Sequence, residues 1–146
     1  IAFSTSGCRI SFDDSLSGFE VPKLILQPLV ENAIYHGIKM KPGKGFIWVN
    51  GEKTPEAGIL LTVKDNGAGM SDEVLARVTA RLETETAENM QEKKNGFGLY
   101  YVNARLGLRY GKAFRMEITS TPESGTTIKL FLPLEPEVQE MAAENV

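Results

Sequence analysis

Hydrophobic and polar positions follow two different periods along the chain, and each period predicts a type of element. Alternation of apolar and polar residues predicts five strands, over residues 9–13, 45–52, 58–65, 113–120 and 126–132. Apolar residues spaced by three and four positions predict three helices, over residues 22–37, 71–82 and 98–108. The turn-prone segments TPEAG and TPESG join neighbouring strands into two hairpins.

The order of these elements predicts the fold class. A strand, a helix, a hairpin, two helices and a final hairpin place the helices on one face of a largely antiparallel sheet. We therefore expect an α+β fold, a two-layer α/β sandwich whose mixed, mostly antiparallel sheet has about five strands and about three helices on one face. It should occupy residues 1–134, followed by an acidic tail over residues 135–146.

Two local features qualify the helix predictions. Pro28 lies inside the first helical pattern, where an interior proline costs about 3 kcal/mol, so we expect a kink or a late start there, and Gly37 should close that helix. The polar stretch ETETAENMQEKKNG, residues 83–96, has no apolar period and is either a disordered insertion or a mobile functional loop.

Composition and charge exclude several classes of protein. With 42% hydrophobic residues among 146, the chain has the composition of a folded domain rather than of a disordered one. A net charge of −3 without a massed basic patch argues against a nucleic-acid partner. One cysteine, Cys8, excludes an internal disulfide, and no apolar run approaches the roughly 18 residues of a membrane span. Because the chain begins with Ile1, we expect it to be part of a longer protein.

The end of the third predicted strand carries a candidate for base recognition. Alternation along residues 61–65 turns Asp65 toward the core, where a carboxylate needs a partner. The following NGAGM contains Gly67 and Gly69, which let the backbone approach a flat ligand, with Met70 beside it. An inward acid would suit the exocyclic amine of adenine. Alternatively, Asp65 only caps a DNG turn, which is the better explanation for an isolated DxGxG.

Three further features have both a functional and a purely structural explanation. Asn32, next to Glu31 and four residues before His36, offers a hard oxygen ligand for Mg²⁺, or else simply faces solvent. Two lysines and the motif GFG precede a predicted helix, whose N-terminal N–H groups favour phosphates. Thr126 and Thr127 open the last strand, where their hydroxyls could reach a base, although threonine is also a good strand former.

Together these four segments resemble, in order and spacing, the nucleotide-binding motifs of the Bergerat ATPase superfamily, which includes DNA gyrase, heat-shock chaperones, MutL and histidine kinases. LQPLVENAIYHG, DNGAGM, GFGLYYVNARL and GTTIKLFLP are most similar to the N, G1, G2 and G3 boxes of sensor histidine kinases of the LytS/YesM-like branch. The resemblance extends from Ile10 to Pro133 and implies the Bergerat ATP-binding fold, with ATP and Mg²⁺ as ligands.

The resemblance also implies individual roles. It makes Asn32 the Mg²⁺ ligand, Glu31 a residue that positions water or metal, and Asp65 the acceptor for the adenine amine. The adenine wall and the lid over the phosphates would be shaped by Gly67, Gly69, Gly96 and Gly98, and Thr126 or Thr127 would assist base binding. Further nucleotide contacts are implied for His36, Lys39, Met70, Lys94 and Leu99.

Three positions depart from the family pattern. Tyr35 stands where many kinases have a lysine near the phosphates, so that charge must come from Lys39, Lys41, Lys93 or Lys94. Tyr101 replaces the usual polar residue in the second box. Pro28 stands where gyrase-type hydrolases place a water-activating glutamate, and its presence favours phosphoryl transfer over hydrolysis.

The function implied is that of the ATP-binding catalytic domain of a two-component sensor histidine kinase. It would transfer the γ-phosphoryl group to a histidine on its own upstream dimerisation domain, since the single histidine, His36, belongs to the ATP site. The full-length protein would be a homodimer anchored in a bacterial inner membrane. It would act on a response regulator, with this domain in the cytoplasm and not touching the membrane. The alternatives are an anti-sigma-type serine kinase and a catalytically degenerate nucleotide-binding or interaction domain.

Overall fold

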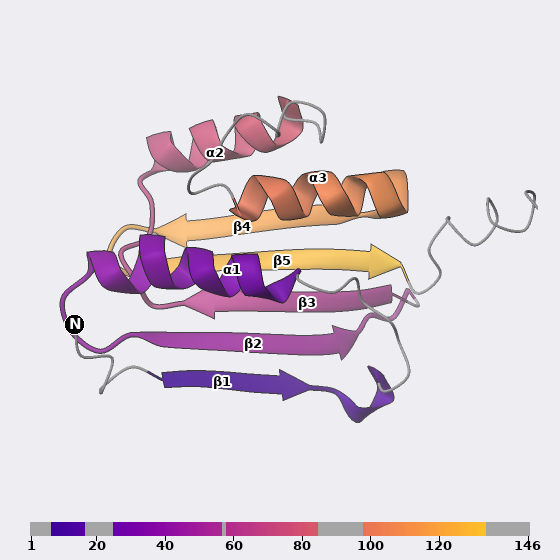
Figure 1. Cartoon of the computed structure of the whole chain (residues 1–146), viewed down its shortest axis with the longest axis horizontal. Helices are drawn as coiled ribbons and strands as arrows, with labels where there is room; N and C mark the ends of the chain where they lie inside the picture. Colours follow the sequence, from indigo (N-terminus) through magenta and orange to yellow (C-terminus); the bar gives the residue numbers. More distant parts are fainter. Residues whose placement is uncertain (1–6, 17–24, 57, 85–97, 134–146) are drawn as a thin grey trace, which may run out of the picture.

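A five-stranded sheet with helices on one face forms the part of the chain that the structure, a computed structural model, describes: residues 7–16, 25–56, 58–84 and 98–133. The strands are β1 Gly7–Phe12, β2 Phe46–Lys53, β3 Gly58–Asp65, β4 Arg115–Thr121 and β5 Gly125–Pro133. They are arranged in the order β1-β2-β3-β5-β4, with β1 parallel to β2 and every other pair antiparallel. The predicted two-layer α+β fold, with its mixed and mostly antiparallel sheet, is therefore confirmed (Figure 1).

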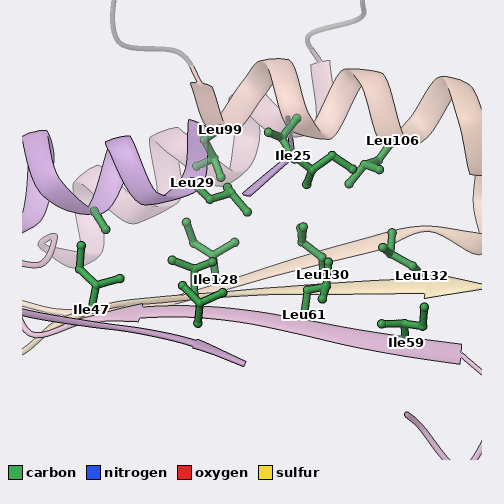
Figure 2. Packing of buried hydrophobic residues seen from close by; sticks show 14 of the residues in the cluster. Ile25, Leu29, Ile47, Ile59, Leu61, Leu99, Leu106, Ile128, Leu130 and Leu132 are labelled. Carbon is green, nitrogen blue, oxygen red and sulfur yellow. The ribbon is translucent and has the colours of Figure 1, made fainter. Parts of the chain in front are cut away.

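The core fills the space between the sheet and the helices α1 Leu26–Asn32, α2 Asp72–Thr84 and α3 Gly98–Tyr110. Figure 2 shows Leu29, Leu99 and Leu106 reaching down from the helices toward alternate residues of the strands. Because side chains alternate across a strand, the buried residues of β3 and β5 fall at every second position. This pattern turns Asp65 to the inner face of the sheet, as predicted from Leu61 and Val63.

The first helix differs from its prediction at both ends. Its described α-helical part begins at Leu26, so Pro28 lies in the first turn, where its missing N–H is not needed, and the expected late start is confirmed. At the other end, Gly37 does not close the helix. A π turn, Ala33–Gly37, and a 3-10 turn, Ile38–Met40, continue the coil, and Gly37 has a φ of −101° rather than a left-handed conformation.

The remaining boundaries lie within two or three residues of their predictions. Ser71 caps α2 as expected, since its Oγ accepts a hydrogen bond from the N–H of Val74 at 3.3 Å. Helix α2 continues to Thr84, into the segment predicted as a loop, and the rest of that segment lies outside the described residues, as does the acidic tail. None of the described helices is long and apolar enough to span a membrane.

Candidate functional site

A cavity of about 380 Å³ opens where β3 ends and β5 begins, under the three helices. Its walls come from the first helical segment, the loop after β3, α2, α3, β4 and β5. They are formed by Asn32, His36, Gly37, Met40, Asp65, Ala68, Gly69, Met70, Val74, Val78, Leu99, Tyr100, Ile118, Thr126 and Ile128. A mostly apolar lining with a few polar groups is typical of sites for small organic ligands.

Asp65 is the buried charge of this cavity. Its side chain is 4% exposed, and its Oδ1 accepts a hydrogen bond from the N–H of Gly67 at 2.8 Å. Burial raises the pKa of Asp65 above its ordinary value, while the backbone N–H groups of Gly67 and Thr126 act in the opposite direction. The carboxyl group is thus held in place by backbone donors and has further acceptor capacity for a ligand.

Two glycines allow the backbone to pack directly against this carboxyl group. A Cβ at Gly37 would lie 2.6 Å from Oδ1 of Asp65, and a Cβ at Gly67 would lie 2.1 Å from the carbonyl carbon of Gly37. The N–H of Ala68 donates to the carbonyl of Gly37 at 2.9 Å and joins the same two segments. Gly37 is therefore required for the close approach of the helix to Asp65.

The turn between β4 and β5 closes the floor of the cavity from the other side. Gly69 and Gly125 both have positive φ, 66° and 115°, and a Cβ at Gly125 would lie 1.9 Å from the carbonyl oxygen of Asp65. The N–H of Glu123 donates to the carbonyl of Ala68 at 2.6 Å. The loop after β3 and the β4–β5 turn therefore pack main chain against main chain.

The predicted phosphate-binding lysines have other contacts among the described residues. Lys41 Nζ donates to the backbone carbonyls of Asn66, at 3.3 Å, and Glu123, and so ties the loop after β3 to the β4–β5 turn. Lys39 Nζ lies 4.3 Å from the centre of the ring of Tyr35. Lys93 and Lys94 lie outside the described residues.

A hydroxyl network borders the cavity at the start of β5. Ser120 Oγ accepts a hydrogen bond from the N–H of Met70 at 2.8 Å and lies 2.8 Å from Thr126 Oγ1. It also donates to the carbonyl oxygen of Gly125 at 3.1 Å. The cavity wall formed by Met70 and Thr126 is thus fixed by a residue that does not line the cavity itself.

Seven of the predicted site residues line the cavity together. The wall contains Asn32, His36, Asp65, Gly69, Met70, Leu99 and Thr126. Thr127 instead pairs with Lys64, on the opposite strand face from Thr126. Gly67 forms the floor behind Asp65, and Gly98 begins α3 where a Cβ would lie 3.0 Å from Pro28 Cβ.

Among the described residues, Glu31 is a predicted site residue that does not line the cavity. Glu31 is exposed, and its Oε1 accepts a hydrogen bond from Gln27 Nε2 at 3.0 Å, away from the cavity lining. Gly96 lies outside the described residues, like Lys94. The roles expected for these residues and for those that line the cavity remain predictions.

Several contributors to the cavity were not predicted from the sequence. Val74, Val78, Tyr100 and Ile118 supply its apolar wall, and Gly37 and Ser120 support its floor and side. Alternation along β4 carried a signal for Ser120, because it places Ser120 on the inner face with Ile118 and opposite Thr126. No local pattern distinguishes Gly37 from an ordinary helix end.

Comparison with known sequences gives a consistent set of similarities. A family model described as histidine kinase-, DNA gyrase B-, and HSP90-like ATPase matches residues 20–136. The sensor protein LytS of Oceanobacillus iheyensis is 34% identical over 124 residues, which cover 85% of this chain and 20% of LytS. The sensor histidine kinase YesM of Bacillus subtilis is 30% identical over 129 residues, with coverages of 88% and 20%. The chain therefore spans about a fifth of the length of these relatives.

Comparison with solved structures shows the same fold. The nucleotide-free catalytic domain of the histidine kinase ThkA superposes with a TM-score of 0.60 at 12% identity, covering 89% of this chain and 79% of ThkA. The histidine kinase domain of the blue-light activated kinase of Erythrobacter litoralis EL346 gives a TM-score of 0.59 at 15% identity, with coverages of 89% and 55%. At these identities the likeness concerns the fold alone.

Proposed function

The chain belongs to the histidine kinase-, DNA gyrase B-, and HSP90-like ATPase family, and we propose that it is the ATP-binding catalytic domain of a two-component sensor histidine kinase. One observation carries the proposal: a buried carboxyl group, Asp65, and the amide of Asn32 line the same cavity, although they are 33 positions apart in the chain. The similarity to LytS and YesM supports the choice of sensor kinases within the family.

The base of ATP occupies the inner end of this cavity. Asp65 accepts a hydrogen bond from the exocyclic amine of adenine, because the carboxylate keeps free acceptor sites after binding the N–H of Gly67. Ile118 and Ile128 belong to the apolar lining against which a purine ring can pack. The closely packed glycines keep the carboxyl group from moving away from the base.

Asn32, rather than a cluster of protein carboxylates, would hold Mg²⁺ beside the phosphates of ATP. The described residues contain no group of three histidine, cysteine, aspartate or glutamate side chains that could hold a metal. Asn32 supplies one hard oxygen ligand, which suits an ion that otherwise keeps waters and phosphate oxygens. His36, one turn later, belongs to the same wall and would lie toward the phosphates.

The domain transfers a phosphoryl group to another protein segment rather than to water. Pro28, one turn before Asn32, provides no general base, and it packs where α3 begins. A histidine nitrogen of the upstream dimerisation domain attacks the γ-phosphorus, and the bond to the bridging oxygen of ADP breaks. The phosphohistidine then donates its phosphoryl group to a response regulator. As in sensor kinases of this branch, the full-length protein is a homodimer anchored in the inner membrane, with this domain in the cytoplasm.

Calorimetric titration of the 146-residue chain tests the binding step. With Mg²⁺ present, a non-hydrolysable ATP analogue is expected to bind and to release heat, and binding should weaken in Asn32→Ala when Mg²⁺ is present. Asp14→Asn is the matched control, because Asp14 is exposed and does not line the cavity. Absence of binding at millimolar nucleotide would overturn the proposal.

A transfer assay separates the kinase from its alternatives. Labelled ATP, this chain and a separately produced dimerisation domain of the same protein should yield an acid-labile, base-stable label on that domain. An acid-stable phosphoserine on a partner would instead identify a serine kinase. Nucleotide binding without transfer would identify a degenerate domain.

A further inference from the structure

The hydroxyl of Ser120 connects three groups beside the cavity. It accepts from the N–H of Met70 at 2.8 Å, and it lies 3.1 Å from the carbonyl oxygen of Gly125, which can only accept. It also lies 2.8 Å from Thr126 Oγ1, which can donate or accept. Ser120 and Thr126 are direct partners across β4 and β5, so their side chains share the inner face of the sheet.

Counting protons determines which way these bonds run. A hydroxyl has one proton and two lone pairs. The N–H of Met70 uses one lone pair of Ser120, and the carbonyl of Gly125 takes its proton. The second lone pair of Ser120 is then used only if Thr126 donates to it, and all three contacts are satisfied together.

The reverse arrangement leaves a buried acceptor without this partner. If Ser120 donated to Thr126, the carbonyl of buried Gly125 would lose the hydroxyl that now bonds to it. Leaving a buried polar group without its partner costs more free energy than an equivalent new hydrogen bond contributes elsewhere. The favoured arrangement therefore leaves Thr126 with lone pairs, and no proton, for the cavity.

We propose that Ser120 fixes Thr126 as a hydrogen-bond acceptor and thereby makes the site select adenine over guanine; this inference rests on the proposed function. Thr126 borders Asp65, because its backbone N–H is one of the donors to that carboxyl group. The base therefore meets two acceptors. Adenine offers an amine with two N–H groups at this edge, whereas guanine offers the acceptor O6. Ser120 is a positioning residue, since it does not line the cavity.

The ratio of affinities for ATP and GTP tests this proposal. Calorimetry with non-hydrolysable analogues of both nucleotides and Mg²⁺ gives the two Kd values on the same protein. In Ser120→Ala the hydroxyl proton of Thr126 is free to point into the cavity, where it can donate a hydrogen bond to O6 of guanine. We therefore expect the preference for ATP over GTP to fall by about 5- to 10-fold. Ser120→Thr keeps the hydroxyl and should keep the preference.

A second pair of variants shows whether the effect passes through Thr126. Thr126→Val removes an acceptor without creating a donor, so its preference for ATP should fall less than that of Ser120→Ala. Adding Ser120→Ala to Thr126→Val should change the ratio no further, because no hydroxyl remains to be oriented. If Ser120→Ala does not fold, Thr126→Val alone still tests the proposal, because its preference for ATP should fall below that of the unmodified chain.

The failure of this inference differs from that of the proposed function. If Ser120→Ala weakens both nucleotides equally, Ser120 only supports Met70 and the inference is wrong. If the unmodified chain binds both nucleotides with the same affinity, the inference is also wrong while the proposed function stands. If the unmodified chain binds neither nucleotide, the proposed function itself has failed.

Discussion

Two hollows of similar size lie at opposite ends of the same sheet, and only one of them has the properties of a site. The cavity at the end of β3 measures about 380 Å³, and a second one at the start of β3 measures about 460 Å³. In the second, Arg115 already pairs with Glu117 at 3.2 Å and lies 4.1 Å from the ring of Phe131. The buried polar side chains of the described residues, Asp65 and Thr126, both line the first. Convergent buried polar groups, rather than volume, therefore identify the site.

The largest effect is expected from a glycine on the floor of the first cavity. Gly125→Ala should lower the free energy of unfolding by about 2–4 kcal/mol, because its φ is 115° and its Cβ would lie 1.9 Å from the carbonyl oxygen of Asp65. Urea unfolding followed by circular dichroism measures this. The control is Gly107→Ala. Gly107 lies in α3 with open space around it, so this variant should raise the free energy of unfolding by about 0.5–1 kcal/mol. Equal losses in both variants would contradict the close packing of this floor.

The next largest effect concerns nucleotide affinity. Asp65→Asn should weaken ATP binding by about 1–3 kcal/mol, because the amide presents a donor where the adenine amine needs an acceptor. Isothermal titration at neutral pH gives the value. Exposed Asp14→Asn should leave the affinity unchanged, and unchanged affinity in both variants would remove Asp65 from base recognition.

The same carboxyl group should make stability depend on pH. Burial raises the pKa of Asp65 above its ordinary value of 3.8, so the native state binds its proton more tightly than the unfolded state does. The resulting stabilisation is complete below 3.8 and is lost as the pH rises through the raised pKa. Urea unfolding from about pH 3 to about pH 7 should therefore show Asp65→Asn gaining stability relative to the unmodified chain. If Asp65→Asn instead lost stability relative to the unmodified chain as the pH rises, the N–H donors of Gly67 and Thr126 would outweigh the effect of burial on the pKa.

A smaller effect is expected where a lysine ties two loops together. Lys41→Met should weaken ATP binding by about 1 kcal/mol, because the carbonyls of Asn66 and Glu123 lose their shared donor. Exposed Lys112→Met serves as the control. Titration at two salt concentrations distinguishes this role from direct phosphate binding, since a phosphate contact would make the loss strongly salt-dependent.

The second hollow should give the smallest effect. Arg115→Ala should change ATP affinity by less than about 2-fold and stability by no more than about 1 kcal/mol, because its ion pair with Glu117 is exposed. Titration and urea unfolding measure both quantities. A loss of affinity comparable to that of Asp65→Asn would abolish the distinction between the two hollows.

The sequence predicted those features that depend on local periods. Alternation along β3 was sufficient to turn Asp65 inward, and Ser71 marked the start of α2, because both follow from a few neighbouring residues. Alternation along β4 turns Ser120 to the inner face, but neither its role nor that of Gly37 could be assigned in this way. Their roles depend on which strand and loop lie opposite them, and that register is decided by packing across the whole sheet.

The π turn over Ala33–Gly37 constrains the length of this segment as well as its residues. The N–H of Ile38 bonds to the carbonyl of Ala33, five residues earlier, so the coil holds one residue more than an α-helix would need. Each residue of an α-helix advances the coil by about 100°. Because the wide turn already takes up one extra residue, inserting another one here would rotate Asn32 by about that angle relative to Gly37. In this family member, an insertion of a single residue in the helix would thus separate the amide of Asn32 from the carboxyl group of Asp65 as effectively as a substitution.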